Sequence, residues 1–478
     1  MAEFPILGIV YLAIPIFLLV LTLKIAFRQC KAQGAHDLPQ KDSPILSEPP
    51  ETVLQQQSYQ IKPQALHSEN SRCPHALKHE MLYIRKQTRI IERKDGDGKN
   101  LSRRHEARIV PNQRLKLAFG LDNIFTTQKE VDGYKFKQQA ISVMKEAMNL
   151  SNTEKREDWS ELVKHMRSTL QKEDSRIEGS INLASLVQYV TLSISLKYLF
   201  NISDATLADN VTGVKFIAKR INELWVLSKQ QPAPKWEDEM EMHYHLLVVT
   251  GRDSLNSFDN PMNLILPAYD TMWRAVFRGI LEIYFRDQSG HNPILWQSIL
   301  ATYLSDQRQR NWKWDDDVFQ LSCLDIIKEV LRLYPPTRRI YRQYPGQNKI
   351  SADIEHMQRT FTLAGDDPES FRPHRWVQLK EILGPGKLKD VEESMGFMPF
   401  ALVCPAGGRE TKGFGWKMIA LLIAVFMEKL RELEGNWRLR SEKEDDNIPE
   451  LGKAMRSGRD DYLSLVYEKT ESVLEADE

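Results

Sequence analysis

The stretch Cys-Leu-Asp-Ile-Ile-Lys-Glu-Val-Leu-Arg-Leu-Tyr-Pro-Pro, residues 323–336, carries the strongest single signal in this chain. Its apolar positions recur every three or four residues, which predicts a helix, and the paired prolines end that helix. Glu329 and Arg332 are three residues apart, so they lie on one helical face within reach of an ion pair. Such a pair is common on solvent-exposed helices and contributes little there, so it decides nothing alone.

Two features further along the chain change how this helix is interpreted. Residues 371–376 read Phe-Arg-Pro-His-Arg-Trp, and a turn-rich connector precedes them. Arg375 can therefore fold back and bind the carboxylate of Glu329 with its forked guanidinium. A cysteine, Cys404, then follows Met398-Pro-Phe400. A Glu–Arg–Arg cluster ahead of a cysteine loop is similar to the framework of haem-thiolate monooxygenases, and the chain resembles the cytochrome P-450 superfamily, most closely its divergent fungal members.

The resemblance covers residues 110–435, approximately, and implies a mainly α fold with a small β region. In that fold a haem b group lies between a long central helix and a C-terminal helix. Cys404 would then be the axial ligand of the haem iron, because a thiolate pushes electron density onto iron and favours O–O cleavage. Arg342 lies ten residues past Arg332, where the family places a basic residue that pairs with a haem propionate, and Arg339 is a nearby substitute. Glu329, Arg332 and Arg375 would hold the fold around the cysteine loop and take no part in the chemistry.

The long apolar stretch at residues 264–285 matches the central helix of the family. Ala268, Asp270 and Thr271 fit its pattern of a small residue followed by an acid–alcohol pair. The resemblance implies that Thr271 positions dioxygen and a water, and that Asp270 relays protons from solvent. A structural alternative stays open, in which Thr271 bonds to a helix carbonyl and Asp270 pairs with Arg274 four residues on.

The cysteine loop departs from the family pattern. Counting back from Cys404, Phe400 stands where the family has a glycine and Leu402 where it has a basic residue. The glycine serves a tight turn and the basic residue neutralises a propionate. The sequence therefore leaves two readings, a loop built in another way or a degenerate haemless relative acting as a membrane-bound helical interaction protein. A haem-dependent isomerase or peroxide user is a further option if Asp270 and Thr271 are dispensable.

Composition excludes some classes of function. The 478 residues include 65 Lys plus Arg and 65 Asp plus Glu, and this balance argues against a nucleic-acid-binding protein. Four cysteines without paired spacing do not form a disulfide framework, which fits a reducing compartment. The chain shows no glycine-rich phosphate loop and no dinucleotide fingerprint. Electrons for a monooxygenase would therefore come from a separate NADPH reductase, as the resemblance implies, for inserting one atom of O₂ into an apolar substrate.

The N-terminal segment predicts a membrane anchor. Residues 5–23 contain no charge, and Lys24, Arg28 and Lys31 follow them. A helix of that length spans roughly 28 Å, about one hydrocarbon core. The basic residues on the C-terminal side place the body of the protein in the cytosol, as a single-pass protein of the endoplasmic reticulum membrane. A cleaved signal peptide is the alternative, but a basic n-region and a small-residue cleavage site are missing.

These observations predict four regions and a set of helices. The regions are an anchor at 1–28, a linker and charged, poorly ordered segment at 29–108, a haem-thiolate domain at 109–470 and an acidic tail at 471–478. Hydrophobic periodicity predicts helices over 136–150, 158–172, 181–200, 213–228, 238–250, 264–285, 293–310, 316–334 and 415–434. Short strands and turns are expected over 338–376.

Overall fold

The computed structural model of the chain describes residues 74–92, 106–148, 158–174, 179–286, 291–305, 320–344, 346–384, 388, 391–401, 413–433 and 436–470. All of these residues belong to one compact unit, Gln60–Glu478. The predicted membrane anchor, Cys404 and the acidic tail lie outside the described residues.

The described part is mainly helical. Its α-helices are α2 (Pro74–Glu92), α3 (Glu106–Phe119), α4 (Glu130–Ala147), α5 (Ser160–Asp174), α6 (Leu183–Phe200), α7 (Asp204–Asp209), α8 (Val211–Leu227), α9 (Met240–Thr250), α10 (Met262–Ile280), α11 (His291–Ser305), α12 (Cys323–Leu333), α13 (Ile354–Gln358), α14 (Phe361–Ala364), α15 (His374–Leu383) and α17 (Phe414–Glu432). A π-helical turn, Leu281–Phe285, continues α10. Short 3₁₀ turns occur at Trp236–Asp238, Ser257–Asp259 and Glu444–Asp446. Each helix predicted from periodicity is present, with shifted ends.

Two small antiparallel sheets complete the fold. Strands β1 (Ser180–Asn182), β5 (Leu465–Lys469) and β4 (Trp437–Ser441) form one sheet in the order β1-β5-β4. Strands β2 (Arg339–Arg342) and β3 (Ile350–Asp353) form the other, with Arg339 opposite Asp353. The first sheet joins the start of α6 to the end of the described chain. The mainly α fold with a small β region is thus confirmed for the described residues.

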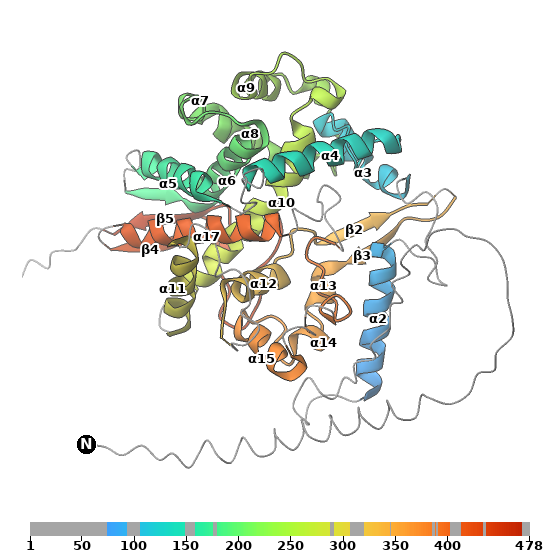
Figure 1. Cartoon of the computed structure of the whole chain (residues 1–478), viewed down its shortest axis with the longest axis vertical. Coiled ribbons are helices and arrows are strands. Elements are labelled where there is room, and N and C mark those ends of the chain that lie inside the picture. Colours follow the sequence, from blue (N-terminus) through green and yellow to red (C-terminus); the bar gives the residue numbers. More distant parts are fainter. Residues whose placement is uncertain are drawn as a thin grey trace, which may run out of the picture. The chain divides into compact units, whose positions relative to one another are not determined.

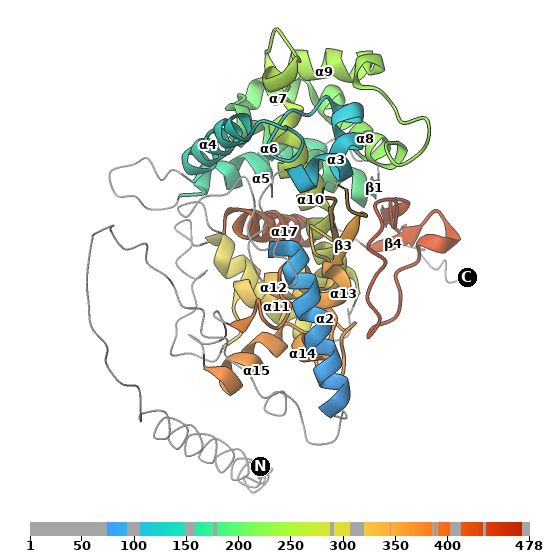
Figure 2. The same cartoon turned by 90° about the vertical axis from the view of Figure 1, so that its right-hand side faces the viewer.

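Helices α10 and α17 lie at the centre of this unit. Figures 1 and 2 show α4 to α9 on one side of them and α12 to α15 on the other. Helix α6 packs against α10 and is the one described helix long and apolar enough to cross a membrane, but 72% of it is buried inside the protein. A helix that is apolar all round belongs in a core when it is covered in this way.

Helix α12 is fixed at both ends by its sequence. At its start the Ser322 hydroxyl accepts a hydrogen bond from the Asp325 N–H at 3.3 Å, and the Asp325 carboxylate accepts one from the Ser322 N–H at 3.0 Å. This reciprocal cap satisfies N–H groups that have no partner within the helix. The helix ends before Pro335-Pro336, as predicted, but begins at Cys323 rather than near residue 316.

The region before residue 109 differs from the prediction of a linker with a charged, poorly ordered segment. Residues 74–92 form α2, which packs against β3, α13 and α14 along the side of the unit (Figure 2). Leu77, Ile84 and Ile91 are buried at seven-residue spacing, while the basic residues between them face solvent. This narrow apolar stripe buries one helical face despite the high charge of the segment.

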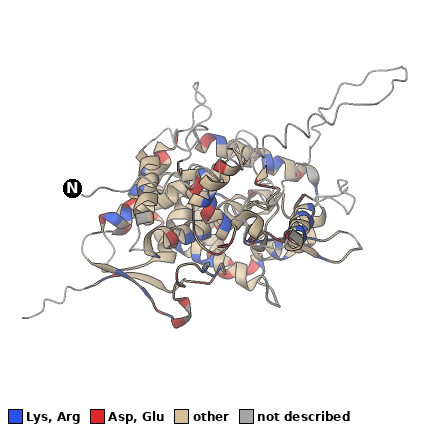
Figure 3. Cartoon of the chain, turned by 90° about the horizontal axis from the view of Figure 1, so that it is seen from below, with Lys and Arg blue, Asp and Glu red and all other residues tan. Residues whose placement is uncertain are grey.

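The segment 338–376 differs from the prediction in a second way. It contains β2 and β3 but ends in a helix, α15, which starts immediately after Pro373. Proline is well tolerated at a helix start, because its fixed φ suits the first turn and its missing N–H is not needed there. Elsewhere acidic and basic side chains are mixed over the described ribbon, in keeping with the zero net charge (Figure 3).

Candidate functional site

Glu329 lies at the centre of a buried hydrogen-bonded cluster. Its exposed fraction is 0%, and that of Arg332 is also 0%. Arg332 donates from Nε to Oε2 of Glu329 at 3.0 Å and from Nη2 to Oε1 at 2.9 Å. Arg375 donates from Nε to Oε1 at 2.9 Å. The predicted meeting of these residues is confirmed.

The carboxylate of Glu329 accepts further hydrogen bonds that sequence reasoning missed. The backbone N–H of Arg372 donates to Oε1 at 2.9 Å, and the indole N–H of Trp376 donates to Oε2 at 3.0 Å. Both donors belong to the Phe-Arg-Pro-His-Arg-Trp segment that suggested the cluster. The hydrogen bond from Trp376 could have been predicted from that segment, because a buried indole N–H usually finds an acceptor.

The two arginines also bind the backbone of the connector. Arg332 donates to the carbonyl oxygens of Pro368 at 2.7 Å and Ser370 at 3.0 Å. Arg375 donates to Ser370 O at 3.1 Å and to the Asp367 carboxylate at 3.2 Å. The cluster thus fixes the connector between α14 and α15 onto α12, and its role around the cysteine loop stays a prediction.

Electrostatics keep Glu329 ionised in this dry site. Burial disfavours the charged carboxylate, but attraction to Arg332 and Arg375 and the hydrogen bonds outweigh it and lower the pKa of Glu329 from 4.5 to about 2. A buried charge is tolerated only when it is paired and hydrogen-bonded on most sides. The Glu329 cluster, meaning Glu329, Arg332, Arg375 and Trp376, meets this condition.

Aromatic side chains flank the segment that carries Cys404. The cysteine itself lies outside the described residues, whose nearest members are Ala401 before it and Gly413 after it. Trp416 of α17 packs against Phe397 with ring centroids 5.7 Å apart, and against Phe400 at 5.9 Å. The described residues on both sides of the Cys404 segment therefore lie at the start of α17.

Cys323, the cysteine on α12, is a poor candidate for a ligand. It is a free thiol and only 1% exposed. Burial raises its pKa well above the ordinary value, with repulsion from Asp325 adding to the effect. A thiol that stays protonated does not ligate a metal well, so Cys323 packs as a small apolar side chain.

Helix α10 has one partly exposed stripe on an otherwise buried surface. Pro267, Ala268, Thr271 and Arg274 are partly exposed, and the rest of the helix is buried. Their three-and-four spacing places them along one side of the helix. The Thr271 hydroxyl donates to the Pro267 carbonyl at 3.4 Å. The local bond of the structural alternative is therefore present.

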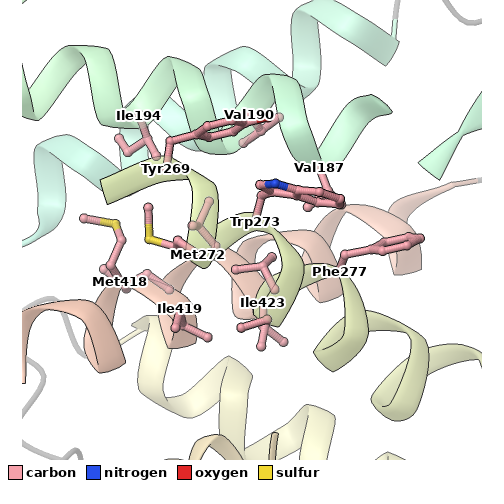
Figure 4. Packing of buried hydrophobic residues seen from close by; sticks show 14 of the residues in the cluster. Val187, Val190, Ile194, Tyr269, Met272, Trp273, Phe277, Met418, Ile419 and Ile423 are labelled. Atoms are coloured by element: carbon pink, nitrogen blue, oxygen red, sulfur yellow. The ribbon is translucent and has the colours of Figure 1, made fainter. Parts of the chain in front are cut away.

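Beyond this stripe α10 packs directly on its neighbours. Tyr269 and Trp273 lie toward α6, and Met272 points toward Met418 and Ile419 of α17 (Figure 4). At Gly279 the helices are so close that an added Cβ would lie 2.5 Å from Cδ1 of Ile423. Helices α10 and α17 are thus in direct contact around Gly279, where no flat cofactor could lie between them.

Asp270 lies in a buried ion pair, but its partner is not the predicted Arg274. Arg459 donates to both carboxylate oxygens of Asp270, at 2.8 Å for Nη2, and also to Oδ1 of Asn222 at 2.9 Å. Arg274 instead donates from Nε to the backbone carbonyl of Asp270 at 3.4 Å. Arg459 precedes β5 and is far away in the sequence, so local spacing could not reveal the pair.

Charged residues recur at four-residue spacing along α10 and the π-helical turn that continues it. Arg278 is 2% exposed and donates to the carbonyl oxygens of Arg456 at 3.2 Å and Gly458 at 3.0 Å. Glu282 binds Arg286 at 2.6 Å and accepts a hydrogen bond from the Tyr334 hydroxyl. This charged edge continues from Asp270 and holds the segment around residues 450–461 against α10.

The predicted propionate-binding residue lies at the end of β2. Arg342 is partly exposed and donates from Nη1 to the Tyr341 carbonyl at 3.0 Å. Its proposed substitute, Arg339, pairs at 2.8 Å with Asp353 on the exposed surface of the sheet. Arg339 is therefore occupied by a strand partner, and the role of Arg342 stays a prediction.

A serine–histidine–aspartate arrangement occurs elsewhere in the fold. His165 lies 2.7 Å from Oδ1 of Asp204 through Nδ1 and 3.0 Å from the Ser193 hydroxyl through Nε2. Ser193 is 1% exposed within α6, so no substrate carbonyl reaches it. The arrangement satisfies buried polar groups and is not an active site. Among the described residues, no group of His, Cys, Asp and Glu is placed to hold a metal ion.

Comparisons with known proteins give a likeness in fold only. No protein-family pattern matches the chain, and no curated protein matches its sequence. The cytochrome P450 CYP175A1 from one strain of Thermus thermophilus aligns with a TM-score of 0.43 and 15% identity over 76% of this chain and 83% of that chain. A 6-coordinated cytochrome P450 from another strain of Thermus thermophilus gives 0.40 and 14%, covering 76% and 86%. A variant of cytochrome P450 OleT in complex with arachidonic acid gives 0.39 and 13%, covering 77% and 83%. A likeness of this size assigns neither a family nor a function.

Proposed function

We propose that the chain is a haem-thiolate monooxygenase that inserts one atom of O₂ into an organic substrate. The observation that carries the proposal is the buried Glu329 cluster, which joins α12 to the connector just ahead of the cysteine segment. The same residues, in the same order before a cysteine, suggested the cytochrome P-450 resemblance. A surface ion pair would not support it, but this one is buried and saturated with hydrogen bonds.

In this proposal a haem group would lie beside the partly exposed stripe of α10. Ala268 and Thr271 belong to this stripe of an otherwise buried helix, and both side chains are small. Cys404 would be the axial ligand from the segment between Ala401 and Gly413, and Arg342 is the candidate for a propionate. When bound, the group would supply oxygen activation at a thiolate-ligated iron.

The chain's own residues would position water and protons near this stripe. Thr271 belongs to it, and its hydroxyl can exchange its 3.4 Å bond to the Pro267 carbonyl for one to a bound water. Asp270 would relay protons only if its pairing with Arg459 opens, because both carboxylate oxygens accept from that guanidinium. Electrons would come from a separate NADPH reductase, and residues 5–23 would anchor the chain in the endoplasmic reticulum membrane with its body in the cytosol.

The test is the carbon monoxide difference spectrum of the reduced full chain, expressed with ample haem precursor. We expect the red-shifted Soret band of a thiolate-ligated haem, and its loss in Cys404→Ser. Cys323→Ser is the matched control and should keep the band, because that thiol is buried on α12. A band that survives Cys404→Ser would refute the ligand assignment.

A second candidate function is a haemless helical interaction protein of the membrane. The close packing of α10 on α17 around Gly279 favours it, since the two helices are in direct contact there. The substitution of a phenylalanine and a leucine for the glycine and basic residue of the cysteine loop favours it as well. A folded, full-length chain that is colourless after expression with haem precursor would select this candidate.

A further inference from the structure

Basic side chains from distant parts of the chain gather beside α10. They come from α3, from the residues just after α8, from α10 itself, and from the segments that precede β2 and β5. The group is called the cationic cluster here, and its members are Arg114, Lys229, Arg274, Arg338 and Arg459.

The Trp225 ring contacts two members of the cationic cluster. The guanidinium carbon of Arg114 is 4.6 Å from the Trp225 ring centroid, and that of Arg459 is 4.5 Å from it. Arg114 also donates to the Ser228 hydroxyl at 2.5 Å, which in turn donates to the Trp225 carbonyl at 2.8 Å. The indole ring therefore brings like charges together at a fixed place near the C-terminal end of α8.

Carboxylates neutralise only part of this charge. Asp270 pairs with Arg459, and Glu355 pairs with Arg338 at 2.8 Å while also serving Arg359 at 2.9 Å. Within the described ranges no carboxylate forms an ion pair with Arg114, Lys229 or Arg274. Arg114 donates to a hydroxyl oxygen, and Arg274 donates to backbone carbonyl oxygens. The cationic cluster thus carries more positive charge than the described protein balances.

The imbalance has an energetic consequence. Partial loss of solvent contact, followed by repulsion from the arginines of the cationic cluster, lowers the pKa of Lys229, which is still exposed, below its ordinary value of 10.5. Burial and then repulsion from Arg459 lower the pKa of Arg274 to about 9. Like charges held this closely disfavour one another's charged forms, so an added anion would be stabilised here.

We propose that Arg114, Lys229 and Arg274 bind the carboxylate of an organic molecule. Arg274 belongs to the partly exposed stripe of α10 that also contains Thr271. Two aromatic rings lie near Arg114. One is that of Trp225, and the other is that of Tyr341 on β2, which is 39% exposed. An anionic group flanked by aromatic rings suits an amphipathic acid better than a free inorganic ion, because the rings cover apolar surface.

The carboxylate has two possible sources. A free organic acid would bind with its charged end at the cationic cluster and its apolar part along the α10 stripe. A haem group beside Ala268 would present its own propionates instead, and in that case the inference rests on the proposed function. The chemistry of recognition is the same, so the experiment must separate the two.

The first arm is calorimetric titration of the full chain, prepared without haem, with 4-phenylbutyrate and with the uncharged analogue 4-phenylbutanol. We expect the acid to bind about tenfold more tightly at low salt, which corresponds to about 1.4 kcal/mol. Lys229→Gln should weaken acid binding about fivefold and leave alcohol binding unchanged. Lys116→Gln, two residues from Arg114 on the exposed side of α3, is the matched control and should bind like the parent.

The second arm titrates the same proteins with haem and with haem dimethyl ester, read by absorbance. If Lys229→Gln weakens haem but not its diester, while 4-phenylbutyrate fails to bind, the site is confirmed and haem supplies the carboxylate. Binding of 4-phenylbutyrate that is equal with and without haem confirms the site for a free acid. If the charged and uncharged forms of both ligands bind equally well, or Lys229→Gln matches the parent throughout, the proposal is overturned. Failure to bind haem in any form would count against the proposed function alone.

Discussion

The Glu329 cluster and the cationic cluster both bring arginines together inside one fold, yet their charges are balanced differently. In the first, each guanidinium faces a carboxylate and backbone carbonyls, and Glu329 accepts from side chains and backbone alike. In the second, Arg114, Lys229 and Arg274 pair with no carboxylate of the described residues. The first therefore closes on itself, and the second is open to an added anion.

This difference separates a structural role from a binding role. A buried ionic cluster that is fully hydrogen-bonded fixes the segments it joins, and removing one member strands the others. A cluster with surplus charge is held together by the fold around it and lowers the stability of the fold through repulsion. The predictions below move from the closed cluster to the open one.

The largest effect is expected at the centre of the closed cluster. Glu329→Ala leaves Arg332 and Arg375 buried without their shared carboxylate, which should cost about 3–5 kcal/mol of unfolding free energy in urea titrations. Glu428→Ala is the matched control, because Glu428 forms a forked pair with Arg167 at 2.7 and 2.8 Å on the exposed surface. It should cost less than about 1 kcal/mol. An equal loss of unfolding free energy in the two variants would show that the Glu329 cluster contributes no more than a surface ion pair.

Acid should weaken the closed cluster in a defined pH window. The pKa of Glu329 is about 2 in the folded chain and 4.5 ordinarily, so its contribution is complete above pH 4.5 and is lost as pH falls toward 2. Linkage puts that contribution at about 3 kcal/mol. The stability difference between the parent and Glu329→Gln should therefore shrink between those pH values. A difference that stays constant from pH 6 to pH 2.5 would contradict the low pKa.

Asp270→Asn tests the charge balance of the cationic cluster, since Asp270 is one of the carboxylates that pair with its members. The variant leaves Arg459, which is 7% exposed, without its counter-ion and should lose about 2 kcal/mol of unfolding free energy. The same variant should bind 4-phenylbutyrate more tightly, because it removes a negative charge near the site. Asp209→Asn, at an exposed position of α7, should change neither quantity. Weaker acid binding in Asp270→Asn would show that Asp270 does not oppose the ligand.

The smallest effect is expected at Lys229. Lys229→Gln should change the unfolding free energy by no more than about 0.5 kcal/mol, with stabilisation favoured because repulsion is relieved. Added salt should stabilise the parent more than this variant, since it screens repulsion that the variant has already lost. Thermal melts at low and high ionic strength give the comparison. A loss of unfolding free energy well above 1 kcal/mol would show that Lys229 has a stabilising partner and that the charge of the cationic cluster is balanced.

The closed cluster could be predicted from the sequence and the open one could not, for a physical reason. Glu329 and Arg332 are a helical turn apart, and Arg375 follows within one connector, so spacing and turn residues suffice to bring them together. The members of the open cluster meet only because α3, α8, α10 and the segments before β2 and β5 converge. The four-residue recurrence of charge from Asp270 to Arg286 was a visible hint that one edge of α10 faces polar partners.

Two parts of the fold, α2 and the C-terminal sheet, differ from the sequence prediction for similar physical reasons. Helix α2 has a narrow apolar stripe among many basic residues, so its composition predicted a linker. Burial of Leu77, Ile84 and Ile91 on that stripe stabilises the helix instead. The strands of the C-terminal sheet are short, and the pairing of β5 with β1 joins residues that are far apart in the sequence. Periodicity over so few residues does not distinguish a strand from a loop.

The haem stoichiometry of the purified full chain tests the central claim most directly. Titration with haem, followed by absorbance and gel filtration, should saturate at one haem per chain, and Cys404→Ser should lose the thiolate spectrum while staying folded. A cooperatively folding parent that binds no haem at saturation would contradict the assignment of this fold to a haem-thiolate enzyme.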